Sequence, residues 1–176
     1  MELFGTMSIN KFIKKQALNK VSEEQSKLIF KQILQGIKAL HARDFCHRDL
    51  KVTNMLIDHS TLRVKIIDFG FACINQDKLK MYCGTKSYMP PELVRRYPYD
   101  GKGMDIWGLG VVLFKLLTGD YPFGADGDKH LDSNIANCYY KAPFFLTERA
   151  KDLLSKMLRP DSNERWPVSK VFFLID

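Results

Sequence analysis

A carboxylate, an ammonium group and a carboxamide lie within six residues of one another at Asp49, Lys51 and Asn54, and a second carboxylate follows at Asp68. The side-chain oxygens of Asn54 and Asp68 are ligands of the kind that Mg²⁺ prefers, with phosphates and water completing its shell. Asp49 is then free to accept a proton or orient a hydroxyl group, and Lys51 can neutralise charge on a transferring phosphoryl group. These residue types therefore suit phosphoryl transfer, provided that the fold brings them together.

Two predicted elements would position these groups. A capping box at Ser22 opens a helix whose apolar face runs to about His41, shortly before the first three groups. Two short apolar runs at 55–57 and 64–67 flank a turn and predict a β-hairpin. The hairpin would return the chain, so we expect the second carboxylate to lie near the carboxamide.

The rest of the chain reads as mostly helical. Residues 69–99 show no sustained period and predict a long ordered loop; a connection of this length in a compact domain is usually functional or disordered. Residues 104–118 are apolar nearly all round and predict a buried central helix that Gly119 ends in the left-handed conformation. Further helices are predicted after the cap residue Thr147 and over 167–174.

Composition narrows the class of protein. The 176 residues are 45% hydrophobic, which is enough to bury a core and excludes global disorder. The net charge of +7 suits nucleic acid, but the lysines are spread along predicted helices and no basic run is interleaved with aromatic residues. The cysteines form no CxxC pair, and the most apolar stretch, 104–117, is too short to span a bilayer. We expect no nucleic acid and no membrane as partner, and an intracellular protein, cytoplasmic or nuclear, with reduced thiols.

Motifs along the chain carry a family resemblance. His-Arg-Asp-Leu-Lys-Val-Thr-Asn at 47–54, followed by Asp-Phe-Gly at 68–70, resembles the catalytic and metal-binding loops of eukaryotic serine/threonine protein kinases. Later motifs resemble other parts of that domain: Cys83-Gly84-Thr85, Pro90-Pro91-Glu92, Asp105-Ile106-Trp107-Gly108 and Arg165. Tyr88 and residues 119–123 are more weakly similar to the group that contains the calcium/calmodulin-dependent and AMP-activated kinases.

The resemblance implies a role for each matched residue. Asp49 would be the catalytic base or hydroxyl-orienting residue, and Lys51 would contact the γ-phosphate of ATP. Asn54 and Asp68 would hold Mg²⁺, and Thr85 would face the substrate. The remaining matched residues would be structural: His47, Arg48, Phe69, Glu92, Asp105 and Arg165. ATP and Mg²⁺ are the implied cofactors.

The resemblance also predicts how much of the kinase domain is present. Residues 1–6 resemble the hinge between the two lobes, where Glu2 and Phe4 would offer backbone groups to adenine, and Leu56 would form part of the adenine floor. Residues 68–92 resemble the activation segment. No Gly-x-Gly-x-x-Gly loop and no strand lysine precede the catalytic loop. We therefore expect the hinge and C-terminal lobe only: a mainly α chain from an α+β family fold, with a small β-hairpin and the N-terminal β-rich lobe absent.

The resemblance indicates one kinase-like domain over 1–176. It implies that the full-length protein transfers the γ-phosphoryl group of ATP to serine or threonine hydroxyls of a protein substrate. Without the glycine loop and the strand lysine the phosphates would be poorly held, so we expect little activity from these residues alone. The missing lobe would also leave an apolar inter-lobe surface that suits a protein partner. The alternative is a non-catalytic kinase-like binding or regulatory module; nucleic-acid binding survives only as an inference from charge.

Regulation by an activation-loop phosphate is a separate expectation. Arg48 directly before Asp49 is typical of kinases in which such a phosphate contacts this arginine. The usual phosphothreonine position is Met81 here, and the usual basic partner is Cys73. We therefore expect control by that threonine to be lost, with Tyr82 as an adjacent possible acceptor.

Overall fold

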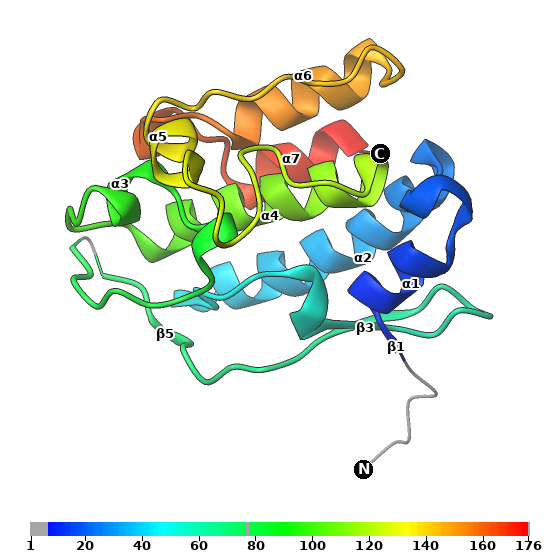
Figure 1. The fold of residues 1–176 in the computed structure, drawn as a ribbon. Coiled ribbons are helices and arrows are strands. Elements are labelled where there is room, and N and C mark those ends of the chain that lie inside the picture. The colour runs from blue at the N-terminus through cyan, green and yellow to red at the C-terminus, as the bar shows by residue number, and fades with distance from the viewer. Residues whose placement is uncertain (1–6, 77, 176) are drawn as a thin grey trace.

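The computed structural model describes residues 7–76 and 78–175, and Figure 1 shows their arrangement. The strands are β1 (Met7–Ser8), β2 (Phe45–Cys46), β3 (Met55–Ile57), β4 (Val64–Ile66) and β5 (Cys73–Ile74). The helices are α1 (Ile9–Lys15), α2 (Glu23–His41), α3 (Pro91–Val94), α4 (Gly101–Thr118), α5 (Leu131–Ala136), α6 (Glu148–Met157) and α7 (Val168–Ile175).

Helix α4 is the centre of the fold. In Figure 1 it crosses the middle of the molecule with α2 on one side and α6 on the other, and α7 packs against both α2 and α6. Nearly all its residues are buried, and Trp107 stacks on Phe123. The helix starts three residues earlier than predicted because the Asp100 carboxylate accepts a hydrogen bond from the Gly103 N–H, at 2.6 Å. The predicted end is confirmed: Gly119 has φ 84°, and a side chain there would strike the Asn19 carbonyl.

Helix α2 leads directly to the first of the candidate catalytic residues. Its predicted cap is confirmed, since the Ser22 hydroxyl accepts a hydrogen bond from the Gln25 N–H. The apolar face is fully buried at Ile29, Ile33 and Ile37, against α4 and α7. This packing fixes the end of α2, and with it the start of β2 and the loop that follows.

Two small antiparallel sheets lie beside the helices. The predicted hairpin is confirmed as β3 and β4, with Met55 opposite Ile66, and β1 adds a third strand, with Met7 opposite Ile57. In the second sheet, β2 pairs with β5 so that Cys46 lies opposite Cys73. The second sheet places the strand before residues 47–54 next to the strand that follows Asp-Phe-Gly.

The predicted fold class was wrong. A mainly α chain from an α+β family fold was expected, with one small β-hairpin and the N-terminal β-rich lobe absent, but β1 from the N-terminal region completes a three-stranded sheet and β2–β5 form another. The fold is therefore α+β. The two-residue strands escaped prediction because Met7–Ser8 and Cys73–Ile74 are too short to show an alternating pattern, and they form through pairing with distant residues.

The predicted long loop contains more structure than its sequence suggests. Residues 69–99 include β5 and the short helix α3, and Leu79 exchanges backbone hydrogen bonds with Tyr99 at 2.9 and 3.0 Å. These contacts fold the segment back onto the start of α4. No helix in the described part of the chain is both long and apolar enough to cross a bilayer.

Candidate active site

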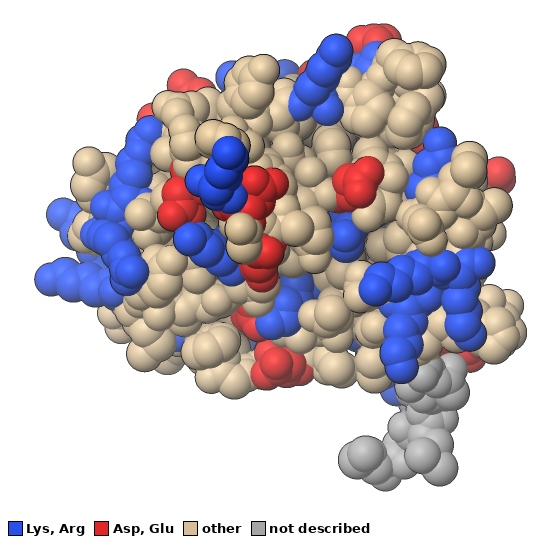
Figure 2. Space-filling model, in the orientation of Figure 1, with Lys and Arg blue, Asp and Glu red and all other residues tan. Residues whose placement is uncertain are grey.

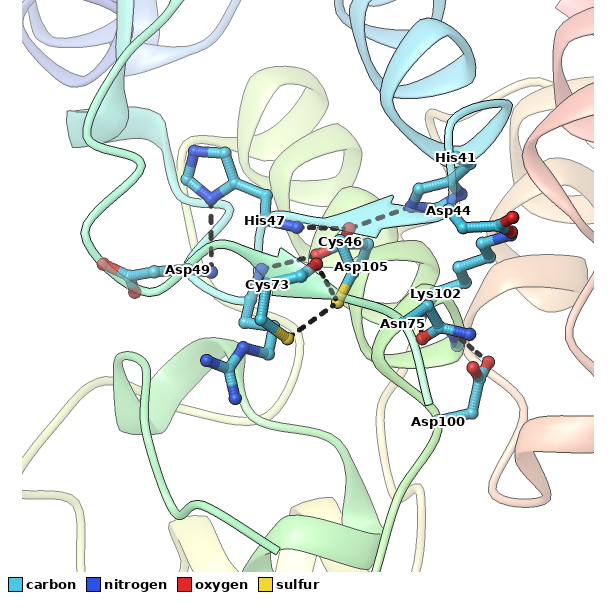
Figure 3. Close-up of polar contacts among 12 residues, drawn as sticks. His41, Asp44, Cys46, His47, Asp49, Cys73, Asn75, Asp100, Lys102 and Asp105 are labelled. Carbon is cyan, nitrogen blue, oxygen red and sulfur yellow. Dashed lines mark hydrogen bonds and ion pairs between the residues drawn. The ribbon is translucent and has the colours of Figure 1, made fainter. Parts of the chain in front are cut away.

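One buried carboxylate on α4 holds the loop that carries the candidate catalytic residues. Asp105, 1% exposed, accepts hydrogen bonds from the backbone N–H groups of His47 and Arg48, both at 2.8 Å. His41 Nε2 lies 2.9 Å from the same carboxylate, and Figure 3 shows the contacts of His41 and His47 with Asp105. Arg48 has φ 65°, a strained conformation for a long side chain, so these bonds offset a local backbone cost.

His47 connects this loop to the Asp-Phe-Gly segment. Its Nδ1 accepts the Asp49 N–H at 3.3 Å, and its Nε2 lies 3.1 Å from the Ile67 carbonyl oxygen. This pairing fits a neutral imidazole whose proton is on Nε2. The ring also packs on Phe69, with ring centroids 4.9 Å apart. The contacts place the residue before Asp68 close to the loop that carries the candidate catalytic residues.

A cluster of polar side chains that contact one another is formed by four of the candidate residues: Asp49, Lys51, Asn54 and Thr85. Lys51 Nζ lies 2.7 Å from the Asp49 carboxylate, and Asn54 Nδ2 donates to the same carboxylate at 2.9 Å. The Thr85 hydroxyl donates to Asp49 at 3.0 Å and accepts from Lys51 at 2.8 Å. The Thr85 hydroxyl thus sits where Asp49 can accept a proton from it and Lys51 can approach its oxygen.

Asn54 and Asp68 supply oxygen atoms that fit a magnesium ion. Because the Asn54 amide nitrogen donates twice to Asp49, the amide oxygen remains as an acceptor. The Ile67 N–H donates to the Asn54 carbonyl at 2.9 Å, which places the Asp68 backbone nearby. Asp68 is exposed and has φ 62°. A carboxylate and a carboxamide suit Mg²⁺ with substrate phosphates as further ligands. The part of the chain that is described contains no cluster of three or more His, Cys, Asp or Glu side chains suited to a metal.

Arg48 makes its side-chain contacts to uncharged groups. The Nε–H donates to the Phe71 carbonyl at 2.7 Å, and an Nη1–H donates to the Tyr99 hydroxyl at 3.2 Å. The Tyr99 hydroxyl in turn donates to the Met81 carbonyl at 2.8 Å. Burial raises the pKa of Tyr99 to about 12, so this hydroxyl stays protonated at neutral pH. Within the described ranges, Arg48 has no ion-pair partner.

A glycine allows residues 83–85 to approach the loop that carries Arg48 and Asp49. Gly84 has φ 96°, and a Cβ there would lie 2.9 Å from the Arg48 carbonyl oxygen. No other residue fits both the conformation and the space without movement of one backbone segment. Gly84 therefore permits the neighbouring Thr85 to reach Asp49.

A buried ion pair joins Glu92, at the end of the segment that resembles a kinase activation segment, to the C-terminal part of the chain. Arg165 Nη1 and Nη2 donate to the two Glu92 oxygens at 2.6 and 2.7 Å, and the Arg165 side chain is 1% exposed. The other guanidinium N–H groups donate to three backbone carbonyls, of Gly103, Arg159 and Pro160. All five donors of this guanidinium are thus used.

The three residues that the resemblance assigns to adenine stay predictions. Glu2 and Phe4, with the rest of 1–6, lie outside the described residues. Leu56 is half-buried in β3, opposite Ser8 of β1.

On the face drawn in Figure 2, the basic side chains form separate groups, one of them over α1, and acidic side chains lie among those at the centre. Helix α1 has exposed lysines at Lys11, Lys14 and Lys15.

Comparison with known proteins decides the family. The family model of the protein kinase domain matches residues 1–172 of this chain. The chain belongs to the protein kinase family. The probable serine/threonine-protein kinase HSL1 of Saccharomyces cerevisiae is 41% identical over 148 residues, covering 83% of this chain and 10% of that protein. CBL-interacting protein kinase 26 of Oryza sativa subsp. japonica is 37% identical over 163 residues, covering 90% and 33%. The probable serine/threonine-protein kinase MARK-A of Dictyostelium discoideum is 38% identical over 153 residues, covering 86% and 14%.

This kinase chain therefore spans a third or less of the length of these three relatives. The relatives fall in the group that contains the calcium/calmodulin-dependent and AMP-activated kinases, as the weaker similarity suggested. The prediction that the chain is a C-terminal lobe alone is wrong, because the family match includes the N-terminal region and β1 there joins a three-stranded sheet. An apolar inter-lobe surface for a protein partner was expected only because the N-terminal lobe was predicted to be absent. We therefore withdraw that expectation as well.

Sequence reasoning missed several supporting residues of this kinase. Tyr99 and Asp126 were not singled out, although the Tyr99 hydroxyl bonds to Arg48 and the Asp126 carboxylate accepts the Ser87 N–H at 2.7 Å. His41 was assigned only to the end of a helix, yet it reaches Asp105. A single sequence offers no signal for these contacts, since each joins residues far apart in the chain.

The Glu92–Arg165 pair yields a stability prediction. Replacing Glu92→Gln keeps the shape but leaves the buried guanidinium without its counter-charge, so we expect the free energy of unfolding to fall by about 3 kcal/mol. Glu164→Gln is the matched control, because its contact with Arg159 is 3.8 Å long and both side chains are exposed; we expect a change below about 0.5 kcal/mol. Urea unfolding of both variants measures the difference, and equal values would show that the buried pair contributes no more than a surface pair.

Proposed function

We propose that this chain is the catalytic part of a serine/threonine protein kinase that transfers the γ-phosphoryl group of Mg-ATP to protein hydroxyls. The observation that carries the proposal is the polar cluster around Asp49. Its carboxylate contacts a hydroxyl group, Thr85, and an ammonium group, Lys51, both at hydrogen-bonding distance. These are the contacts that a hydroxyl nucleophile and the phosphoryl group approaching it require.

In this proposal Asp49 orients the substrate hydroxyl and accepts its proton. The buried position of the carboxylate and its hydrogen bond from Asn54 hold it in one orientation, which lowers the entropic cost of aligning the nucleophile. Lys51 stabilises negative charge on the transferring group. Asn54 and Asp68 would hold magnesium, which, when bound, neutralises charge on the nucleotide phosphates.

We expect a low rate of phosphoryl transfer when these 176 residues are assayed alone. The 176-residue sequence contains no Gly-x-Gly-x-x-Gly loop and no strand lysine before the catalytic loop. Phosphoryl transfer depends almost entirely on how the phosphates are positioned, so the loss of those contacts would reduce turnover.

The proposal is tested by phosphoryl transfer from radiolabelled ATP to a mixture of serine- and threonine-containing peptides. We expect Asp49→Asn to lower the rate by about 10²- to 10⁴-fold, because the amide cannot accept the hydroxyl proton. Asp152→Asn, in an exposed ion pair on α6, is the matched control and should keep the rate. Melting curves show whether each variant folds.

Two results would contradict this function. Transfer that is equal in Asp49→Asn and wild-type protein would exclude Asp49 from the chemistry. Wild-type protein that neither transfers phosphate nor melts at a higher temperature with Mg-ATP would instead favour the non-catalytic kinase-like binding module.

We also propose that the activation segment needs no phosphothreonine. Met81 stands at the expected phosphate position, and Arg48 is already bonded to the Phe71 carbonyl and the Tyr99 hydroxyl. The Tyr99 hydroxyl joins Arg48 to the Met81 carbonyl, which is the connection that a phosphate on this segment would otherwise make.

This proposal is tested by treating the purified protein with phosphatase before the transfer assay. We expect the rate to survive that treatment, and Tyr99→Phe to lower it about tenfold, because an Arg48 N–H and the Met81 carbonyl lose a partner. Tyr97→Phe is the control, since Tyr97 is exposed. Loss of activity on phosphatase treatment, with phosphate mapped to Tyr82 or another segment residue, would overturn the idea.

A further inference from the structure

Two thiols face each other across the sheet that joins the catalytic loop to the activation segment. Cys46 and Cys73 are directly opposite in the antiparallel pair β2–β5, and their Sγ atoms are 3.5 Å apart. Figure 3 shows both side chains with their sulfur atoms turned toward each other. The Cys46 thiol also donates a hydrogen bond to the Cys73 carbonyl, at 3.4 Å.

The backbone geometry of this pair suits a disulfide. Directly opposite residues of antiparallel strands have Cα atoms about 4.5 to 5.5 Å apart, and disulfides span Cα separations of about 4.4 to 6.8 Å. Bond formation therefore needs the two sulfur atoms to move together without separating the strands. A side chain at Gly101 would collide with Cys46 Sγ, so the start of α4 confines this sulfur beside Cys73.

The other two thiols have different neighbours. Cys83 is buried with its sulfur 3.7 Å from the Tyr99 hydroxyl, and Cys138 donates to the Leu158 carbonyl at 3.1 Å. Neither contact involves a second sulfur. Cys46 and Cys73 are accordingly the pair whose sulfur atoms the fold places close enough to cross-link.

We propose that Cys46 and Cys73 form a reversible disulfide when the protein meets a hydroperoxide. In the first step the Cys73 sulfur attacks the peroxide oxygen, giving a sulfenic acid and one water molecule from hydrogen peroxide. In the second step the Cys46 sulfur attacks the Cys73 sulfur and the sulfenic oxygen leaves as water. Two thiols and one hydrogen peroxide thus give one disulfide and two waters.

The order of the two steps follows from exposure. Cys73 is half-buried and within reach of a small oxidant, whereas Cys46 is fully buried. Burial, together with the nearby charge of Asp105, raises the pKa of the Cys46 thiol, which makes it a poor first target. Cys46 then serves as the thiol that resolves the oxidised Cys73.

The cross-link would enclose every residue that we assign to catalysis or magnesium. Residues 47–72 would become a closed loop that contains Asp49, Lys51, Asn54 and Asp68. It would also fix β5 beside β2, and with β5 the Phe71 carbonyl that Arg48 contacts. The oxidised protein should therefore keep the folded arrangement and unfold at a higher temperature, since the unfolded chain is constrained.

The test uses the whole protein, exposed to a small excess of hydrogen peroxide, alkylated and digested without reduction. We expect mass spectrometry to find Cys46 and Cys73 in one cross-linked peptide pair that dithiothreitol separates. The melting temperature should rise by about 5 °C on oxidation and return on reduction. Cys138→Ala is the matched control and should still cross-link, whereas Cys73→Ser should abolish both the peptide pair and the rise.

Three results would overturn the proposal. Cys73 found as a sulfinic acid while Cys46 keeps its thiol would show that Cys46 does not resolve the oxidised Cys73. Cross-links from Cys46 or Cys73 to Cys83 or Cys138 would show that the strand pair does not select the partner. Four intact thiols after peroxide treatment would show that Cys73 is not reactive. None of these readouts depends on kinase activity, so the proposed function and this inference can fail separately.

Discussion

The carboxylate of Asp105 is the interaction on which the rest of the site depends. It lies at the centre of the molecule on α4 and accepts the N–H groups of His47 and Arg48, while His41 from the end of α2 contacts it as well. A buried charge is stable only when its hydrogen-bonding capacity is filled. The requirement works in both directions, because satisfying Asp105 also forces the loop into the strained backbone that presents Asp49.

The same requirement recurs at two other buried charges. The Arg165 guanidinium uses its donors on Glu92 and three carbonyls, which joins the activation segment to the C-terminal part of the chain. Arg48 uses its donors on neutral groups of the activation segment. Each charge therefore joins segments that are far apart in the sequence, and together they fix the loops around Asp49 more firmly than loop propensity could.

Local patterns were predictable where the signal was local. The Ser22 cap, the hairpin of β3 and β4, and the left-handed end of α4 at Gly119 followed from residue type and period, and the structure confirms them. The polar residues from Asp49 to Asn54 could be selected from their chemistry, and the structure brings them together with Thr85. Their catalytic roles stay predictions.

The features that could not be predicted from the sequence depend on contacts between residues far apart in the chain. The strands β1 and β5 have two residues each and no pattern of their own, so the N-terminal strand and the second sheet were missed. The Cys46–Cys73 contact and the Tyr99 bond to Arg48 likewise arise only from pairing in three dimensions. Short elements stabilised by distant partners are where a single sequence carries least information.

Hydrogen exchange at the His47 and Arg48 amides tests the central role of Asp105 most directly. In Asp105→Asn one oxygen is replaced by an NH₂ group, which cannot accept both amides, and we expect exchange there to accelerate at least about tenfold. Asp100→Asn is the matched control, because asparagine caps a helix as well as aspartate does, and it should leave these amides protected. Unchanged exchange in Asp105→Asn, in a protein that remains folded, would contradict the account.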